Sequence, residues 1–326
     1  KSFNVRTNYF DIVYQVGNSE YHIYMFDYIK KYKGTVVLHD YNLHGVAQYK
    51  ALSCEKQNYR LYERYLKEDY DDSIIQTYLK QLINSETTLI IYELELNGFI
   101  TNYANKIIVH SDDAKEKLLN KDFSRSVKTI RSYAKIERLG DSGKVKEDNG
   151  IDSECIIISS FGHIHETKRV LPILRAFSSI CEKHINIRYM FVGKLDASLD
   201  NIFNSMVREL NLENKVTVTG YTELQDFETY INMTDICLNL RYPYNGETSG
   251  RLMRILAKGK SVIVNDIGSF GELPDDICLK IPNVANMTVQ QEVDEIYKAV
   301  DQLLSDRVFR MQIGDNARKY AEQNLD

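Results

Sequence analysis

The segment from residue 236 to residue 274 reads ICLNLRYPYNGETSGRLMRILAKGKSVIVNDIGSFGELP, and the rest of the chain is interpreted from it. Two short apolar runs, 236–240 and 261–265, have the length and composition of buried strands. Between them lie a loop rich in turn-forming residues and an amphipathic helix that Thr248 or Ser249 caps. This order predicts a βαβ unit with parallel strands. The loop then lies at the carboxyl end of its strand, where open α/β sheets bind ligands.

The helix of this unit and the loop before it carry the first candidate site residues. Gly259 ends the helix at a position that commonly requires a positive φ. The free N–H groups at the helix start, near Ser249 and Gly250, favour a phosphate. A carboxylate beside a phosphate suits a nucleotide sugar, because Glu247 would accept hydrogen bonds from the sugar while the helix start holds the diphosphate. Alternatively, Glu247 is only a charge that favours a helix amino terminus.

The string NGETSGRLMRILAKGKSVIVNDIGSFGELP resembles the donor-binding signature of glycosyltransferase family 4, the retaining enzymes of the GT-B fold. That signature has two glutamates, then a helix, a glycine and a strand. Glu247 matches the first glutamate and Gly250 the glycine that follows it. Arg254 holds the place of the second glutamate, and the interval is one residue shorter. The resemblance implies that Glu247 contacts the donor sugar, whereas Arg254 departs from the residue that normally contacts the ribose.

Length and composition fit a cytoplasmic protein of two domains. The chain has 326 residues, 43% of them hydrophobic and 27% charged, which is ordinary for a globular protein. A net charge of -5 gives no sign of a nucleic-acid partner. Five scattered cysteines without metal-ligand spacing favour reduced thiols. No apolar run is long enough to span a membrane, and peripheral contact with the inner face of the membrane stays open.

The alternation of strands and helices predicts an α/β protein of GT-B type, with two Rossmann-like domains facing a cleft. We expect an amino-terminal domain at 1–136, a polar linker at 137–154 and a carboxyl-terminal nucleotide-sugar-binding domain at 155–326. The chain does not begin with methionine and lacks the glycine-rich opening loop usual in the family. We therefore expect an incomplete amino-terminal domain. The predicted strands are 9–16, 35–38, 106–109, 127–130, 155–160, 187–192, 215–219, 236–240, 261–265 and 277–281, and the predicted helices are 19–32, several within 46–84, 90–103, 113–120, 168–184, 198–211, 223–233 and those of 288–323.

The first strand of the carboxyl-terminal domain ends in a glycine that is followed by cations. Gly162 allows the backbone to approach a phosphate, and Lys168 or Arg169 would neutralise it. The family resemblance expects Gly-Arg here and a cation five residues later. His163 replaces that arginine, so Arg169 or Arg241 would have to compensate. The alternative is that the two adjacent cations are simply a solvated first turn.

Later strands of this domain end at the same predicted sheet edge. Gly193-Lys194 and Gly220-Tyr221 follow two of them, and Tyr221 would stack near the base of a nucleotide unless it only packs on its own helix. The predicted donor-binding residues are Gly162, His163, Arg169, Gly193, Lys194, Gly220, Tyr221, Arg241, Thr248, Ser249, Gly250 and Arg254.

The amino-terminal half also has polar loops after its strands, YQVGNS at 14–19 and LHDYNLHG at 38–45. The resemblance implies that both face the cleft. A histidine at such a strand end commonly lies near the donor sugar in this family, and His39 matches it. The alternative is a hydrogen-bonded structural histidine. The predicted acceptor-side residues are Gly17, Asn18, Asp40, His44 and His110.

Three further patterns are not taken as sites. Asp69-Tyr70-Asp71 spells a DxD motif, but it lies in a polar helical stretch, and we expect surface charge. The tripeptide 259–261 resembles the end of a P-loop without its first glycine. His163 and His165 lack a carboxylate or cysteine partner at fitting spacing, so no metal is predicted.

The resemblance implies a retaining, metal-independent hexosyltransferase, with Lys168, Glu247 and His39 as its catalytic group. The donor would be a nucleoside-diphosphate sugar, with no separate cofactor. The acceptor would be a glycan, glycolipid or protein hydroxyl, in glycan or cell-surface polysaccharide synthesis. Two alternatives stay open: a non-catalytic GT-B partner subunit that binds acceptor or another protein, and a sugar-nucleotide epimerase.

Overall fold

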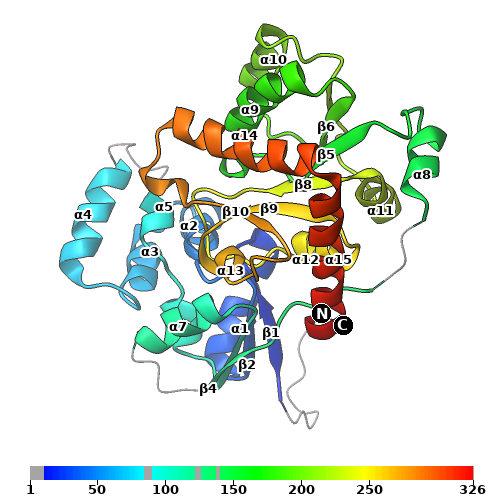
Figure 1. The fold of residues 1–326 in the computed structure, drawn as a ribbon. Coiled ribbons are helices and arrows are strands. Elements are labelled where there is room, and N and C mark those ends of the chain that lie inside the picture. The colour runs from blue at the N-terminus through cyan, green and yellow to red at the C-terminus, as the bar shows by residue number, and fades with distance from the viewer. Residues whose placement is uncertain (1–10, 84–89, 122–125, 137–139, 326) are drawn as a thin grey trace. The chain divides into compact units, whose positions relative to one another are not determined.

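The structure is a computed structural model that describes residues 11–83, 90–121, 126–136 and 140–325. It divides into two compact units, each built on a sheet. Unit 1 comprises residues 1–131 and 243–248, and unit 2 comprises residues 132–242 and 249–326. Unit 1 has a four-stranded sheet and unit 2 a six-stranded sheet (Figure 1). Every strand pair is parallel, which confirms the expected α/β class.

In unit 1 the strands follow the order β1-β2-β3-β4. All four residues of β2 are buried, whereas buried and exposed residues alternate along β1, because β2 lies inside the sheet and β1 at its edge. The strands are β1 Val13–Val16, β2 Thr35–Leu38, β3 Lys106–Val109 and β4 Ser126–Thr129. The helices are α1 Met25–Lys31, α2 His44–Gln48, α3 Tyr59–Leu66, α4 Asp72–Ile83, α5 Ile90–Glu93, α6 Gly98–Thr101 and α7 Asp112–Asn120.

The single helix predicted at 90–103 is wrong, because the chain is interrupted between α5 and α6. Side-chain oxygens from distant residues accept the backbone N–H groups there. Leu96 N donates to Asn42 Oδ1 at 3.1 Å. Asn97 N and Gly98 N donate to Asp69 Oδ2 at 3.0 and 2.6 Å. These bonds satisfy the N–H groups that a continuous helix would have paired internally.

In unit 2 the strand order is β10-β9-β8-β5-β6-β7. Consecutive β5 residues Ile157 and Ile158 point to opposite faces, and both are fully buried, so helices cover the sheet on both sides. Figure 1 shows α9 and α14 on one side of the central strands and α12 on the other. The strands are β5 Ile156–Phe161, β6 Ile187–Val192, β7 Val216–Val218, β8 Ile236–Asn239, β9 Ser261–Asn265 and β10 Leu279–Ile281. The helices are α8 Ser142–Asp148, α9 Val170–Lys183, α10 Asp200–Glu209, α11 Leu224–Met233, α12 Gly250–Ala257, α13 Gly268–Gly271, α14 Val289–Ser305 and α15 Arg307–Asn324.

The polar stretch predicted as a linker, 137–154, falls within unit 2, and its residues 137–139 lie outside the described residues. Helix α8 forms within it because Asp141 caps the helix start, accepting from the N–H of Gly143 at 2.9 Å. Lys146 holds the helix to the domain through a 2.8 Å ion pair with Asp235.

The connections of unit 2 change direction between β5 and β8. The chain passes from β5 outward through β6 and β7, then returns to the other side of β5 to form β8. The carboxyl ends of β5 and β8 are therefore the topological switch point, where doubly wound sheets bind their ligands. This position organises the candidate site in unit 2.

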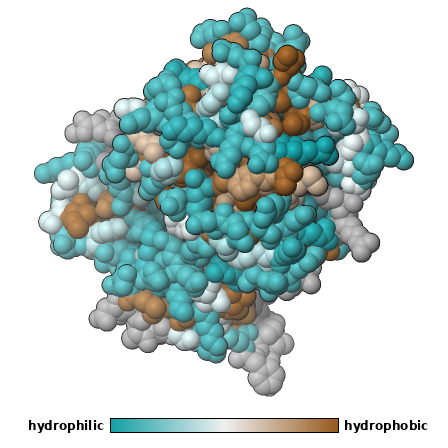
Figure 2. Space-filling view, in the orientation of Figure 1, coloured by the Kyte–Doolittle hydropathy of each residue, from teal (hydrophilic) through white to brown (hydrophobic). Residues whose placement is uncertain are grey.

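Within the described residues, none of the helices combines the length and the apolar character that a bilayer span requires. Figure 2 shows polar residues over most of the visible face and apolar residues in small separate patches.

Candidate functional site

The βαβ unit predicted from residues 236–274 is present in unit 2. Strands β8 and β9 pair in parallel, with Ile236 opposite Ser261. Ser249 Oγ caps α12 by accepting the N–H of Leu252 at 3.2 Å, and Gly259 follows the helix with φ of 68°. The sequence pattern therefore predicted this unit and its caps correctly.

Three glycines with positive φ end neighbouring strands of the same sheet. Gly162, Gly193 and Gly220 follow β5, β6 and β7 with φ of 93°, 149° and 75°. A Cβ at Gly193 would overlap the carbonyl oxygen of Gly162, so these two turns touch backbone to backbone. Such turns leave main-chain atoms open to a ligand that a side chain would block.

Lys168 lies beside the first of these turns, in the 3-10 turn Glu166–Lys168. It is 4% exposed, and its Nζ donates to the carbonyl oxygen of Phe161, the last residue of β5. The ammonium group is therefore held inside the protein at the carboxyl end of the central strand. A solvated first turn, the alternative considered for Lys168, does not describe this placement.

The structure places Arg169 and Arg241 in internal contacts. Arg169 forms a two-pronged ion pair with buried Glu292, with Nε and Nη2 at 2.6 and 2.5 Å from its carboxylate oxygens. Its guanidinium also lies 5.6 Å from the centre of the Tyr242 ring. Arg241 donates from Nη1 to the carbonyl oxygen of Leu240 at 2.7 Å. Arg169 thus already has a carboxylate partner, and its role in donor binding stays a prediction.

The two histidines after Gly162 differ in environment. His163 Nε2 lies 3.1 Å from Asp196 Oδ2. Burial lowers the pKa of His165 to about 4, and the positive charges of Lys168 and Arg241 lower it further. His165 is therefore neutral at physiological pH, so it adds no charge to this edge of the sheet.

The remaining donor-side candidates lie nearer the surface. Arg254, in the second glutamate's place, forms a 3.4 Å ion pair with Glu228 of α11, which also lies 3.1 Å from Lys258 Nζ. Tyr221 is 78% exposed and Lys194 is exposed. An exposed tyrosine is open to a stacking partner, and the alternative that Tyr221 packs on its own helix does not describe this placement.

The loop that carries Glu247 belongs to unit 1. Its segment 243–248 pairs with residues 40–42 through an antiparallel bridge between Asp40 and Glu247. Tyr41 N donates to Gly246 O at 3.0 Å, and Gly246 has a φ of 73°. A Cβ at Gly246 would lie 2.5 Å from the Cβ of Tyr41. Only glycine fits at position 246, where the two segments pair. The pairing brings Glu247 beside Asp40, a predicted acceptor-side residue.

Asp40 is the most perturbed carboxyl group of this cluster. Burial raises its pKa to about 6; the N–H of Asn18, 2.6 Å from Oδ2, lowers the pKa, and nearby Glu247 raises it again. Glu247 Oε2 in turn accepts the N–H of Asn245 at 2.8 Å. A Cβ at Gly17 would lie 3.0 Å from Asp40 Oδ2. The structure therefore gathers Gly17, Asn18, Asp40 and Glu247.

His39 and His110 form a hydrogen-bonded chain next to this cluster. His110 Nδ1 lies 2.7 Å from the carbonyl oxygen of Ile130, so it carries the proton. His110 Nε2 lies 3.1 Å from His39 Nδ1. Burial lowers the pKa of His39 to about 4, with smaller effects of His110 and His22. His39 Nε2 donates to the side-chain oxygen Oε1 of Gln15 at 2.7 Å.

His44 is placed differently from the other acceptor-side candidates. It is fully buried at the start of α2, with Nδ1 2.6 Å from the carbonyl oxygen of Leu94. Its Nε2 lies 2.5 Å from the Tyr62 hydroxyl, which contacts the Tyr78 hydroxyl at 2.6 Å. Burial lowers the pKa of His44 to about 4. Its contacts are those of a core residue, and an acceptor-side role stays a prediction.

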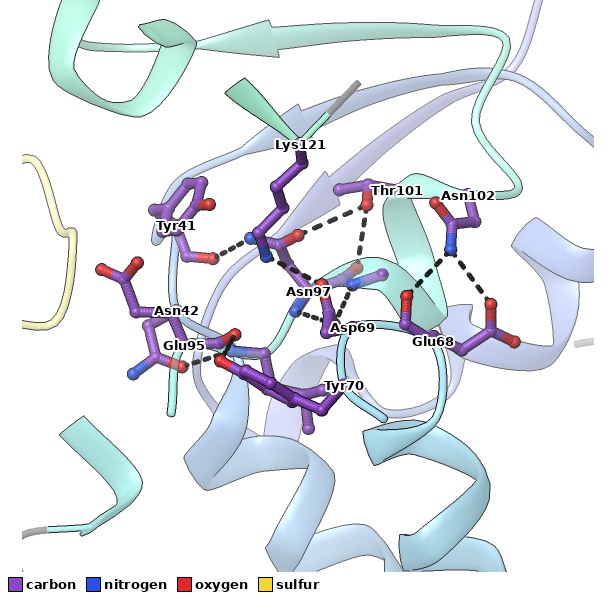
Figure 3. A network of polar contacts seen from close by, with 12 residues as sticks. Tyr41, Asn42, Glu68, Asp69, Tyr70, Glu95, Asn97, Thr101, Asn102 and Lys121 are labelled. Atoms are coloured by element: carbon purple, nitrogen blue, oxygen red, sulfur yellow. Dashed lines mark hydrogen bonds and ion pairs between the residues drawn. The ribbon is translucent and has the colours of Figure 1, made fainter. Parts of the chain in front are cut away.

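Sequence reasoning missed a polar network in unit 1 that includes Asn42, Asp69 and Asn97 (Figure 3). Asn42 is 1% exposed and donates from Nδ2 to Asn245 Oδ1 at 3.0 Å and to Ile91 O at 2.8 Å. The prediction that Asp69 is a surface charge is wrong, because its side chain is only 3% exposed and forms a 2.8 Å ion pair with Lys121. No local pattern marked either residue, because their partners lie far along the chain.

Comparison with known proteins identifies related sequences and structures. The family model described as "Glycosyl transferases group 1" matches residues 141–320. The uncharacterized glycosyltransferase MJ1059 of Methanocaldococcus jannaschii is 24% identical over 128 residues, which are 37% of this chain and 31% of that protein. The chain thus matches less than a third of that relative's length.

Solved structures share the fold at low sequence identity. Sucrose-phosphate synthase from Thermosynechococcus elongatus has a TM-score of 0.66 and 15% identity, covering 96% of this chain and 69% of that one. Anabaena HepE, solved with UDP and glucose, has a TM-score of 0.61 and 14% identity, covering 93% and 77%. Both likenesses support the GT-B-like fold. Because the family model covers more than half of the chain, including all six strands of unit 2, the chain belongs to the glycosyl transferases group 1 family.

Proposed function

We infer that this protein transfers a sugar from a UDP-sugar to an acceptor hydroxyl, with retention at the anomeric carbon. The observation that carries the proposal is the buried Lys168 ammonium beside the Gly162 turn, at the switch point of the six-stranded sheet. A fixed cation beside open backbone is what a diphosphate requires. Membership of the family supports transfer, and the UDP and glucose bound by HepE support uridine as the base.

The leaving group of such a reaction is a nucleoside diphosphate, so the protein must stabilise the charge that develops on it. We assign that task to Lys168 together with the N–H groups at the start of α12. Glu247 accepts hydrogen bonds from the hydroxyls of the donor sugar. His39, which is neutral, orients a sugar hydroxyl without adding charge. The acceptor is a hydroxyl of a glycan, glycolipid or protein.

The test is binding and turnover with UDP-, GDP-, ADP- and dTDP-sugars. A ligand at about 100 times its Kd adds roughly 2.7 kcal/mol of stability, which a thermal-shift assay detects. We expect UDP-sugars to raise Tm, and Lys168→Ala to weaken UDP binding about 10- to 100-fold. Glu247→Ala should leave UDP binding intact, because UDP lacks the sugar, and should lower turnover about 100- to 1,000-fold.

Matched controls remove the same charge elsewhere. Lys144→Ala and Glu213→Ala change exposed residues of unit 2 and should alter neither UDP affinity nor turnover. Failure of every nucleotide sugar to shift Tm would contradict the proposal. Tight UDP binding without release of UDP from any donor would favour a non-catalytic partner subunit. A new sugar nucleotide as product would identify an epimerase.

A further inference from the structure

Arg251 lies in the first turn of α12, directly over the turn that ends β5. A Cβ placed on Gly162 would lie 2.7 Å from Arg251 Cζ and 2.8 Å from its Nε and Nη1. Gly162, with φ of 93°, therefore has the guanidinium of Arg251 in the space where any other residue would have its side chain. The contact joins the ends of β5 and β8, because α12 follows β8 along the chain.

Arg251 differs from the neighbouring arginines in its charge balance. Arg169 is neutralised by Glu292, and Arg254 lies 3.4 Å from Glu228. Within the part of the chain that the structure describes, no carboxylate lies within ion-pair distance of Arg251. Desolvation lowers its pKa, and the positive charge of Arg254 lowers it further. A guanidinium that no carboxylate neutralises, lying against the Gly162 backbone, is suited to receive an anion.

We propose that Arg251 is a phosphate-binding residue of the donor site and supplies, from α12, the permanent cation that His163 does not supply from the end of β5. The inference rests on the proposed function and refines it. The planar guanidinium beside Gly162 offers parallel N–H donors to a phosphate that approaches the end of β5. His163, which follows Gly162 directly, contacts Asp196 at 3.1 Å instead. The diphosphate of the nucleotide sugar is therefore the group that Arg251 recognises.

Calorimetric titration with UDP and with uridine tests this assignment. Arg251→Ala should weaken UDP binding about 10- to 100-fold, the effect of losing a hydrogen bond to a charged group. It should change uridine binding less than about threefold, because uridine has no phosphate. Arg175→Ala, which removes an exposed arginine of α9, is the matched control and should change neither affinity.

A rescue variant separates recognition of charge from loss of structure. Arg251→Ala combined with His163→Arg places an arginine beside the same turn, and we expect it to restore most of the UDP affinity. Unchanged UDP binding in Arg251→Ala, or an equal loss for UDP and uridine, would overturn the inference and leave the proposed function standing. If the unmodified protein bound no nucleotide, the proposed function and this inference would both fail.

Discussion

The polar groups at the strand ends of unit 1 and of unit 2 differ in how burial and ion pairing set their charge. In unit 1, burial keeps His39 neutral, with a pKa of about 4, and raises the pKa of Asp40 to about 6. In unit 2, buried Lys168 donates to the carbonyl oxygen of Phe161, and Arg169 is neutralised by Glu292. Parallel strands present their carboxyl ends in both units, so topology alone does not set the electrostatics. Burial without a counterion favours neutral groups, which suit hydroxyls, whereas an ion pair such as Arg169–Glu292 stabilises the charged forms of both partners.

Removing the Arg169–Glu292 pair is expected to have the largest effect. Arg169→Met leaves the Glu292 carboxylate buried without its partner, so we expect unit 2 to lose about 3–5 kcal/mol of stability in urea unfolding. The double variant Arg169→Met/Glu292→Leu should recover most of that loss, because no charge is left buried. Arg175→Met serves as control. Full stability combined with a large loss of UDP affinity would instead make Arg169 a donor ligand and weaken the contrast between the two units.

The sequence predicted those parts of the molecule that depend on local patterns. The strands of unit 2, the cap at Ser249 and the turn at Gly259 follow from apolar runs and from residue types with strong conformational preferences. The pairing of Arg169 with Glu292 joins residues 123 positions apart, so no local pattern predicts it.

The same limit explains the residues that sequence reasoning placed wrongly or missed. Asp69 belongs to a polar stretch of the sequence. Its buried side chain accepts hydrogen bonds from the backbone N–H groups of Asn97 and Gly98, 28 and 29 residues away. Asn42 likewise binds Asn245 across 203 residues. In a single sequence, a polar side chain that satisfies distant backbone groups has the same appearance as one exposed to solvent.

The shifted pKa values of Asp40 and His39 predict two opposing pH dependences of the stability of unit 1. Asp40 has a pKa of about 6 when folded and about 3.9 when unfolded, so the folded state binds more protons between these values and stability falls as pH rises. His39 has a pKa of about 4 when folded and about 6.5 when unfolded, so the unfolded state binds more protons and stability rises with pH. Each slope reaches at most about 1.4 kcal/mol per pH unit.

Single variants should separate these two slopes. Relative to the unmodified protein, Asp40→Asn should gain stability as pH rises from about 4 to 6. The variant lacks the Asp40 carboxyl group, whose contribution to stability falls over this interval. Relative to the unmodified protein, His39→Gln should lose stability as pH rises over the same interval. The variant lacks the His39 imidazole, whose contribution to stability rises there. Urea unfolding at several pH values in this interval measures both differences, and the remaining histidines cancel because every protein compared has them. Parallel stability curves for all three proteins would show that burial does not set the charge of this cluster.

Substitution of Tyr221 should have the smallest effect on stability, and it tests where unit 2 recognises the base of the donor. Its side chain is 78% exposed after the Gly220 turn, so Tyr221→Ala should change the unfolding free energy by less than about 0.5 kcal/mol. If the base of the donor stacks on this ring, the same variant should weaken uridine and UDP binding by equal factors, because the two ligands share the base. Arg251→Ala is expected to discriminate between them. Equal losses of uridine and UDP affinity in Tyr221→Ala would assign base recognition to the end of β7. A loss of UDP affinity alone in Arg251→Ala would assign phosphate recognition to the ends of β5 and β8. If Tyr221→Ala left both affinities unchanged, the base would have to be recognised elsewhere in unit 2.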